Sequence, residues 1–183
     1  MDADLLLRRI LRDIEVEVLD SASRNFRDQG FFGEKWKRRV GPLRPGGATL
    51  VDSGRLRRSI SSEIQGSAIV FTYGEKYAPY HNEGAEVRVT GRMKRYFWRK
   101  YKETAGAFGR RRDGGLRNDK RTRRLSGEAE FWKWMALKKE GSVIRLPRRR
   151  FLGRSPVLES AVREIIEENL EEYFKDYEIV EGG

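Results

Sequence analysis

Apolar residues recur at helical spacing near both ends of the chain. In the first thirty positions they share one face of a helix, while charged residues fill the gaps from Arg8 to Arg24. The apolar positions of this first series are Leu7, Ile10, Leu11, Ile14, Val18, Ala22 and Phe26. They predict a long amphipathic helix that ends before Gly30. A second series predicts a closing helix, which Ser155 caps and Pro156 begins: Leu158, Val162, Ile165, Ile166, Leu170 and Phe174.

Short runs of β-forming residues lie between these two helices. Ser59–Ile64 and Ala68–Tyr73 are separated only by Gln65–Ser67, so they predict a β-hairpin. Val143–Leu146 predicts a third strand. Gly33–Val51 has no period and contains prolines and glycines, which is typical of a loop.

A third region interrupts this pattern. Four residues recur at helical spacing within a run of lysines and arginines: Met93, Tyr96, Phe97 and Tyr101. Ala105–Arg124 then has few apolar residues and many glycines, which indicates a mobile loop. Glu128–Glu140 regains helical character, with acids first, lysines last and Gly141 as its cap.

These patterns predict an α+β fold with a long N-terminal helix, a small antiparallel sheet and a C-terminal helix. We expect one core domain from residues 1–87 and 143–183. Residues 88–142 are expected to form a basic, partly helical insertion made of a helix, a mobile loop and a helix.

The charge of the chain is concentrated in that insertion. Arg92–Arg124 contains fourteen basic and three acidic residues, a local balance of +11, which equals the net charge of the whole chain. The remainder has 25 basic and 25 acidic residues, and within it Glu159–Glu181 has nine acids and two bases. The chain is therefore a neutral domain with one basic insertion and one acidic end. Its hydrophobic fraction of 38% is lower than usual, so part of the surface should be exposed or covered by a partner.

Reactive side chains are scarce. His81, the only histidine, lies in YAPYHNEG, and no serine-elbow motif or matching acid accompanies it. The chain has no cysteine, so a disulfide or a thiolate metal site is impossible. A phosphate-binding loop motif is also missing. We expect no catalytic, cofactor-binding or metal-binding residue, and a structural role for His81, whose ring would donate to a backbone carbonyl or pack between Tyr77 and Tyr80.

The sequence predicts a protein that is made and works in an aqueous, cytoplasm-like setting. No apolar run approaches the roughly 18 residues that a membrane span needs. The start, MDADLLLRRI, is acidic where a signal peptide would be basic.

Four short motifs occur in order along the chain. They are Trp36, LVDSGRLRRSI (Leu50–Ile60), YAPYHNEGA (Tyr77–Ala85) and LPRRRFLGRSP (Leu146–Pro156). In this the chain resembles the phage virion morphogenesis family of tail-completion proteins, of which Mu-like phages supply examples. That family has a tryptophan, Ser-Gly-x-Leu-x-x-Ser-Ile, Tyr-Ala-x-x-His-x-x-Gly and Pro-x-Arg-x-Phe-Leu-Gly in the same order. The matching positions are Trp36, Ser53, Gly54, Leu56, Ser59, Ile60, Tyr77, Ala78, His81, Gly84, Pro147, Arg149, Phe151, Leu152 and Gly153.

The resemblance covers about residues 26–174, and the block from Arg88 to Ser142 is longer than compact members of the family need. In this respect it is similar to versions in Bacteroidetes-type prophages. For the motif residues we favour core packing and turn geometry over direct partner contact. Ser53–Gly54 would be a turn that launches the hairpin, with Leu56 and Ile60 facing inward.

The resemblance implies a structural protein of the virion neck, needed for tail completion and head–tail joining, with no cofactor and no membrane contact. It implies the head–tail adaptor, the tail terminator and the tail tube as partners, and a homo-oligomeric ring, because neck components commonly form rings. The protein would be assembled in the host cytoplasm and remain in the neck or tail of the virion.

The basic insertion leaves two further interpretations open. A nucleic-acid-binding module without sequence preference would stack bases on Tyr96, Phe97, Trp98 and Tyr101, and could also contact packaged DNA in a neck protein. Its phosphate contacts would be Arg92, Lys94, Arg95, Arg99, Lys100, Arg110, Arg111, Arg112, Arg121, Arg123 and Arg124. Alternatively, the acidic tail of a neighbouring copy or another acidic neck protein would neutralise the same charges. A hydrolase using His81 and Glu83 has the least support.

Three aromatic residues in the second predicted helix of the insertion allow two interpretations. Phe131, Trp132 and Trp134 would either form a surface that is covered in the assembled state or serve as local core beneath the insertion.

Overall fold

The computed structural model describes residues 3–39 and 47–181, in which helices and short strands make up an α+β fold. The chain forms two compact units. The first contains residues 1–37, 48–83 and 148–183, and the second contains residues 38–47 and 84–147. The expected domain boundary at 88 and 142 remains a prediction.

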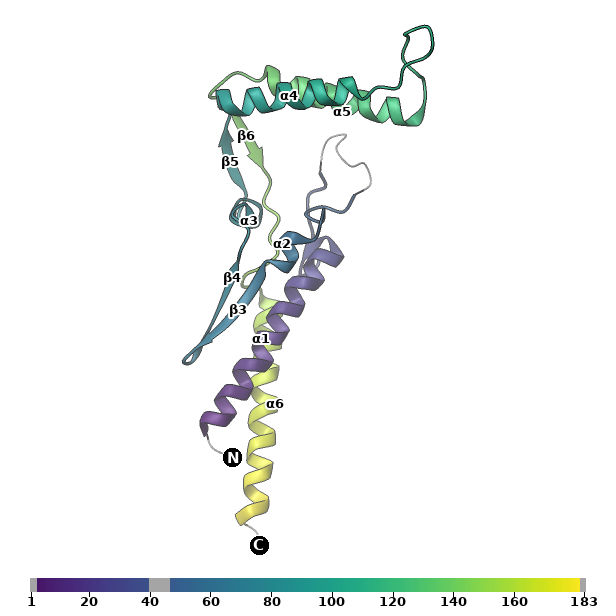
Figure 1. The fold of residues 1–183 in the computed structure, drawn as a ribbon. Coiled ribbons are helices and arrows are strands. Elements are labelled where there is room, and N and C mark those ends of the chain that lie inside the picture. The colour runs from purple at the N-terminus through teal and green to yellow at the C-terminus, as the bar shows by residue number, and fades with distance from the viewer. Residues whose placement is uncertain (1–2, 40–46, 182–183) are drawn as a thin grey trace. The chain divides into compact units, whose positions relative to one another are not determined.

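Two long helices dominate the first unit. α1 (Ala3–Asp28) and α6 (Pro156–Glu181) lie side by side and run in opposite directions (Figure 1). Asn169 on α6 donates to Asp13 on α1 at 3.0 Å. Both helices were predicted, and α6 begins at the proline that the sequence indicates. The buried stripe of α1 differs at its start, because Leu6 is buried there while Leu7 is exposed.

Short antiparallel strands accompany these helices. The predicted hairpin is confirmed, with Ile60 opposite Tyr73 and Gln65 opposite Ala68. A smaller ribbon after α1 was not predicted. The four strands of this unit are β1 (Gly30–Phe31), β2 (Glu34–Lys35), β3 (Ile60–Gln65) and β4 (Ala68–Tyr73).

Two short helices and a short strand replace segments predicted as turn or loop. Ser53–Gly54 does not lead directly into the hairpin, because α2 (Arg55–Arg58) comes first. α3 (Ala78–Asn82) includes His81, and proline at the first turn is compatible with a helix start. The predicted loop 33–51 contains strand β2, and its residues 40–46 lie outside the described part of the chain.

The longer segment of the second unit, residues 84–147, begins and ends in a two-stranded ribbon. β5 (Ala85–Arg88) pairs with β6 (Val143–Leu146), so that Ala85 lies opposite Leu146. β6 is the predicted third strand, whereas β5 was not predicted. Among the described residues the strands form three separate antiparallel pairs, where the sequence predicted one small sheet.

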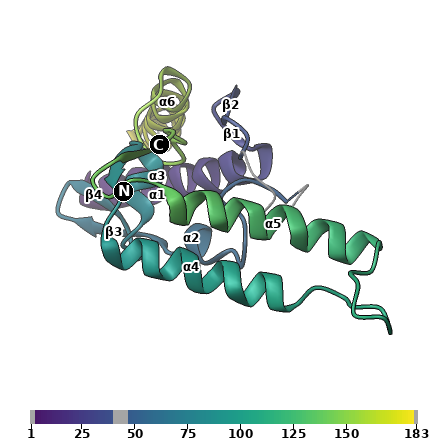
Figure 2. The ribbon, with the colours of Figure 1, turned by 90° about the horizontal axis from the view of Figure 1, so that it is seen from above.

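A helical hairpin extends from this ribbon. α4 (Gly91–Gly106) and α5 (Lys120–Leu137) pack along each other, as the views in Figures 1 and 2 agree. α5 begins eight residues before the predicted Glu128, because the Asp119 carboxylate caps it by accepting from the Thr122 N–H at 2.7 Å. The same hydrogen bond lowers the pKa of Asp119. The glycine-rich connection is therefore limited to residues 107–119.

Candidate functional site

The motifs meet around Phe151, in the irregular segment Arg148–Ser155 that precedes α6. The Phe151 ring is fully buried, with its centre 5.1 Å from that of Phe26 on α1 and 6.1 Å from that of Tyr73 on β4. Phe26 meets Trp36 edge-on at 5.5 Å. The buried members of this group, here called the Phe151 cluster, are Phe26, Trp36, Leu56, Ala78 and Phe151. Each of the four motifs thus supplies at least one buried side chain.

Asn82 holds the backbone of the irregular segment. Its side chain is buried, and its Oδ1 accepts from the backbone N–H groups of Phe151 at 2.9 Å and Leu152 at 3.1 Å. Its Nδ2 donates to the Leu152 carbonyl at 3.0 Å. One side-chain amide therefore hydrogen-bonds the backbone groups of two consecutive residues. In a sheet, the backbone of a neighbouring strand would make such bonds.

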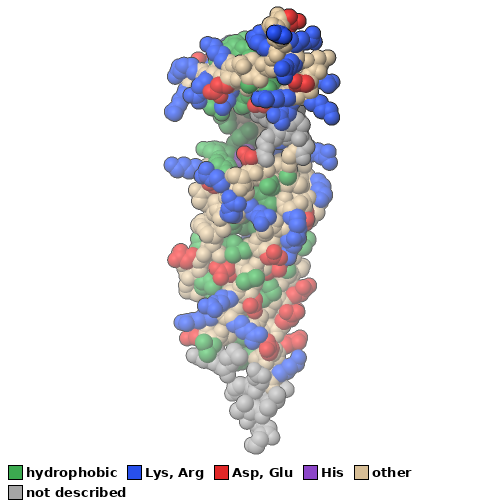
Figure 3. Space-filling view, turned by 45° about the vertical axis from the view of Figure 1, so that its right-hand side comes forward, with side chains coloured by type: hydrophobic (Ala, Val, Ile, Leu, Met, Phe, Trp, Pro, Cys, Tyr) green, Lys and Arg blue, Asp and Glu red, His purple; other side chains and the backbone are tan. Residues whose placement is uncertain are grey.

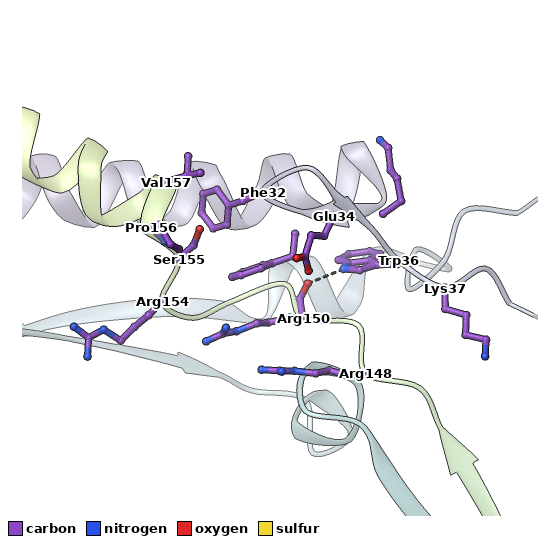
Figure 4. A pocket seen from close by; sticks show the side chains of 12 residues that line it. Phe32, Glu34, Trp36, Lys37, Arg148, Arg150, Arg154, Ser155, Pro156 and Val157 are labelled. Carbon is purple, nitrogen blue, oxygen red and sulfur yellow. Dashed lines mark hydrogen bonds between the residues drawn. The ribbon is translucent and has the colours of Figure 1, made fainter.

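Asn25 and Trp36 bind the same segment from the N-terminal part of the chain. The Asn25 Nδ2 donates to the Phe151 carbonyl at 3.2 Å, and its Oδ1 accepts from the Phe32 N–H at 3.0 Å. The Trp36 indole N–H donates to the Arg150 carbonyl at 2.7 Å, the dashed line in Figure 4. The bonds to the Phe151 and Arg150 carbonyls join residues more than a hundred positions apart.

Arg149 and His81 complete this network. The Arg149 N–H donates to the His81 carbonyl at 2.8 Å, while its buried guanidinium donates from Nε to the Lys37 carbonyl at 3.0 Å. Every residue from Arg149 to Leu152 thus has a backbone group bound by a distant residue. These residues fix the shape of the chain where α6 begins.

The His81 ring lies half-buried and edge-on to Tyr77, with ring centres 5.9 Å apart. Burial, and secondarily the positive charge of Arg149, lower its pKa below the usual value. Its Nδ1 is buried and has no hydrogen-bond partner among the described residues. Packing against Tyr77 is therefore present, and the backbone carbonyl of His81, not its ring, makes the hydrogen bond to the motif segment.

The remaining motif positions serve turns and the edge of the cluster. Gly54 has φ 75°, which favours glycine before α2. A Cβ on Gly153, which has φ 141°, would lie 2.5 Å from the Arg150 guanidinium. Other positions lie at or near the surface of the first unit: Ser53, Ser59, Ile60, Tyr77 and Leu152. Gly84 and Pro147 fall in the second unit, next to its ribbon.

Two central residues, Asn25 and Asn82, were missed by sequence reasoning. Asn25 lies on the buried face of α1, directly before Phe26 in the sequence. Asn82 comes directly after His81. An asparagine on an apolar helical face is the signal that could have identified Asn25, because a buried amide needs partners.

A hollow of about 420 Å³ lies beside the cluster within the first unit (Figure 4). Its aromatic side consists of Phe31, Phe32 and Trp36, and the start of α6 borders it at Val157. Five cations and one carboxylate also line it, a formal balance of +4: Lys35, Lys37, Arg148, Arg150, Arg154 and Glu34. The Arg150 guanidinium lies over the Phe31 ring at 4.8 Å.

In the second unit, aromatic side chains hold the helical hairpin together. Phe97 of α4 is buried and stacks on Trp132 of α5, with ring centres 6.1 Å apart and planes at 24°. Tyr96 meets Trp132 edge-on at 6.1 Å. Trp132 is therefore local core, and the Phe97 ring is not free to stack on a base. Trp134, in contrast, is 58% exposed, with Lys138 Nζ 3.8 Å above its ring.

The predicted basic contact residues all lie on this hairpin or its connection. Nine are exposed and two, Lys94 and Lys100, are half-buried. Lys100 pairs with Glu103 at 2.8 Å, which raises the lysine pKa and lowers the glutamate pKa. Figure 3 shows lysines and arginines gathered over this hairpin. The exposed positions are Arg92, Arg95, Arg99, Arg110, Arg111, Arg112, Arg121, Arg123 and Arg124.

Within residues 3–39 and 47–181, no three His, Cys, Asp or Glu side chains come together as a metal site. No described helix is both long and apolar enough to cross a membrane.

Comparison with known proteins identifies the family. The sequence model of the phage virion morphogenesis family matches residues 3–171 of the 183. Searches among curated proteins and solved structures gave no match. The matched range includes α1, the Phe151 cluster, the hairpin and most of α6. The chain therefore belongs to the phage virion morphogenesis family, and its role is in the assembly of a phage virion.

Proposed function

We propose that the protein completes the tail and joins it to the filled head, as a non-enzymatic component of the neck. The observation that carries this proposal is the Phe151 cluster, in which the four motifs contribute buried side chains and backbone hydrogen bonds. Residues used in this way determine shape, and a shaped subunit is what a joint between two preassembled structures needs. The family membership supports the same role.

The proposed partners are the head–tail adaptor, the tail terminator and the tail tube, and the proposed assembly is a homo-oligomeric ring. The protein would be built into the virion in the host cytoplasm and remain in its neck or tail. The second unit, with its hairpin, is proposed as an insertion in the α+β core.

Disruption of the gene in the phage tests the joining role. Electron micrographs of the lysate should show filled heads beside unattached tails, and the wild-type gene supplied in trans should restore joined particles. Joined particles without the gene, or an excess of empty heads, would contradict the proposal. A matched control is Asn118→Ala supplied in trans, an exposed position that should rescue fully.

A second candidate function is contact with DNA through the hairpin. Its support is the exposed run Arg110–Arg112 at the far end of the hairpin, together with the exposed arginines of α5. Guanidinium groups suit phosphates, and Arg110–Arg112 lie outside the helices, so we expect binding to be independent of sequence. DNA in a packed neck would provide the ligand.

Salt dependence distinguishes this candidate from a purely protein contact. DNA affinity should fall by roughly 0.7–0.9 log units per log unit of salt for each phosphate neutralised. Replacing Arg110, Arg111 and Arg112 together by Gln should reduce that slope, whereas replacing Arg8, Arg12 and Arg27, exposed on α1, should leave it unchanged. If the hairpin variant instead loses only self-association, the basic hairpin contacts acidic protein and not DNA.

A further inference from the structure

α6 carries an exposed stripe that its own unit leaves uncovered. Glu167, Leu170, Glu171 and Phe174 are spaced i, i+3, i+4 and i+7, so they share one helical face. Leu170 is 36% exposed and Phe174 is 57% exposed. The contacts of α6 with α1 are made by a different face, where Asn169 binds Asp13 and Glu172 pairs with Arg9.

The hollow beside the Phe151 cluster has the opposite character. Aromatic rings and Val157 form its apolar part, and its formal charge is +4. The Arg150 Nε is buried and has no hydrogen-bond partner among the described residues. Arg148 and Arg154 form exposed ion pairs with Glu83 at 3.4 Å and Glu159 at 3.3 Å. Exposed pairs of this kind contribute little, so both arginines can exchange partners readily.

We infer that the hollow of one protein molecule receives the exposed α6 stripe of a second copy. Phe174 and Leu170 would pack on the apolar part, near Phe32 and Val157. Glu167 and Glu171 would face Arg148 and Arg154. Charge complementarity favours this occupant, because Glu159–Glu181 has nine acids and two bases and the hollow is basic. DNA is also negatively charged, but it has no apolar side chain to pack on the aromatic part of the hollow.

The stripe cannot reach the hollow of its own chain. Val157 lies in the first turn of α6 and Phe174 lies 17 residues further along the same continuous helix, about 25 Å away at 1.5 Å per residue. The contact must therefore join two molecules through different patches of each. Repetition of such a head-to-tail contact gives a closed ring or an open filament. The inference thus specifies the contact within the proposed ring and depends on that proposal.

Cysteine cross-linking tests this contact cleanly, because the natural chain has no cysteine. Val157→Cys and Phe174→Cys both alter exposed side chains, so both variants should fold. Mixed at about 50 µM under mild oxidation, with different tags on the two chains, they should form a disulfide-linked heterodimer. The matched control replaces Phe174→Cys by Glu168→Cys, also exposed on α6 but about 110° from the middle of the stripe. It should give less than a tenth of the yield.

Equal yields in the two mixtures, or no heterodimer in the first, would overturn the inference. A Val157→Cys homodimer as the main product would also overturn it, since that product requires a twofold contact. A second experiment tests the charges. Glu167→Lys and Glu171→Lys, added to the chain that carries Phe174→Cys, should abolish the cross-link. Reversal of Arg148 and Arg154 to Glu in the other chain should restore at least part of it. Because purified protein is used, failure here with intact head–tail joining in the phage would reject this contact and leave the joining role standing.

Discussion

The Phe151 cluster and the helical hairpin are stabilised in different ways. In the cluster, an irregular backbone is satisfied by Asn25, Trp36 and Asn82, which are distant in sequence. In the hairpin, the helices satisfy their own backbones, and the Phe97–Trp132 stack joins them. The cluster therefore depends on side chains that hydrogen-bond an irregular backbone, whereas the hairpin depends on packing between two regular helices.

This difference has a consequence for how each region tolerates change. A substitution in the cluster removes packing or leaves a buried backbone group without a partner, and both are costly. A substitution on the outer face of the hairpin alters charge without affecting packing. We therefore expect the cluster to be sensitive to substitution and the outer face of the hairpin to tolerate it.

The largest expected effect comes from Phe151→Ala. Removal of this fully buried ring should reduce the free energy of unfolding by about 3–5 kcal/mol. Chemical denaturation followed by tryptophan fluorescence measures the change. The matched control, Trp134→Ala in the hairpin, removes a ring that is 58% exposed and should change stability far less. Similar losses of unfolding free energy in both variants would contradict the difference between the cluster and the hairpin.

Asn82→Ala should have the next largest effect. It leaves the buried N–H of Phe151 and the partly buried N–H of Leu152 without their acceptor, which costs about 1–3 kcal/mol. Asn118→Ala, at an exposed position of the hairpin connection, is the control and should have almost no effect. Faster amide hydrogen exchange at Phe151 and Leu152 in the Asn82 variant would localise the damage; unchanged exchange would argue against this role of Asn82.

His81 should make stability depend on pH. Because burial lowers its pKa in the folded protein, the unfolded chain binds the proton more readily as pH falls below about 6.5. The free energy of unfolding should therefore decrease through that range and be insensitive to this group above it. His81→Ala should cost only about 1 kcal/mol at pH 8 and should flatten the dependence. If the free energy of unfolding varies with pH by the same slope in the wild type and in the variant, groups other than His81 cause the dependence.

The smallest effect is expected from shortening the hairpin connection. Replacing residues 108–118 by a short Gly-Ser linker should change the free energy of unfolding by no more than about 0.5 kcal/mol, because nearly all of these side chains are exposed. The cut spares Asp119, which caps α5, and Thr122, which is buried. A loss of cooperative unfolding, measured by thermal denaturation, would show that the connection belongs to the folded core.

The sequence predicts the regular elements well because their signals are local. Periodicity predicts α1 and α6, and the β-forming runs predict β3, β4 and β6. α5 was predicted too short, because the capping signal at Asp119 lies among glycines and arginines. β5 escaped prediction since only pairing with β6, some sixty residues later, makes it a strand.

The sequence indicated only some of the residues that meet around Phe151. Motif order alone indicates that Trp36, Leu56, Ala78 and Phe151 matter, and the structure brings them together. The part played by Asn25 and Asn82 depends on where a backbone without regular structure passes, and no local pattern encodes that path. The hollow likewise combines residues from β1, β2 and the start of α6, which are distant in sequence.

The ribbon of β5 and β6 makes the hairpin a natural place for a label. Its register holds the two ends of the segment 84–147 together at Ala85 and Leu146, and this pairing does not depend on the length of the chain between them. Gly114 and Gly115 are exposed and lie in the connection between α4 and α5. Exposed loop tips of this kind accept inserted domains better than other sites. In the assembly proposed above, a small rigid protein inserted there would appear as extra density in images of the intact particle and would show where the protein lies.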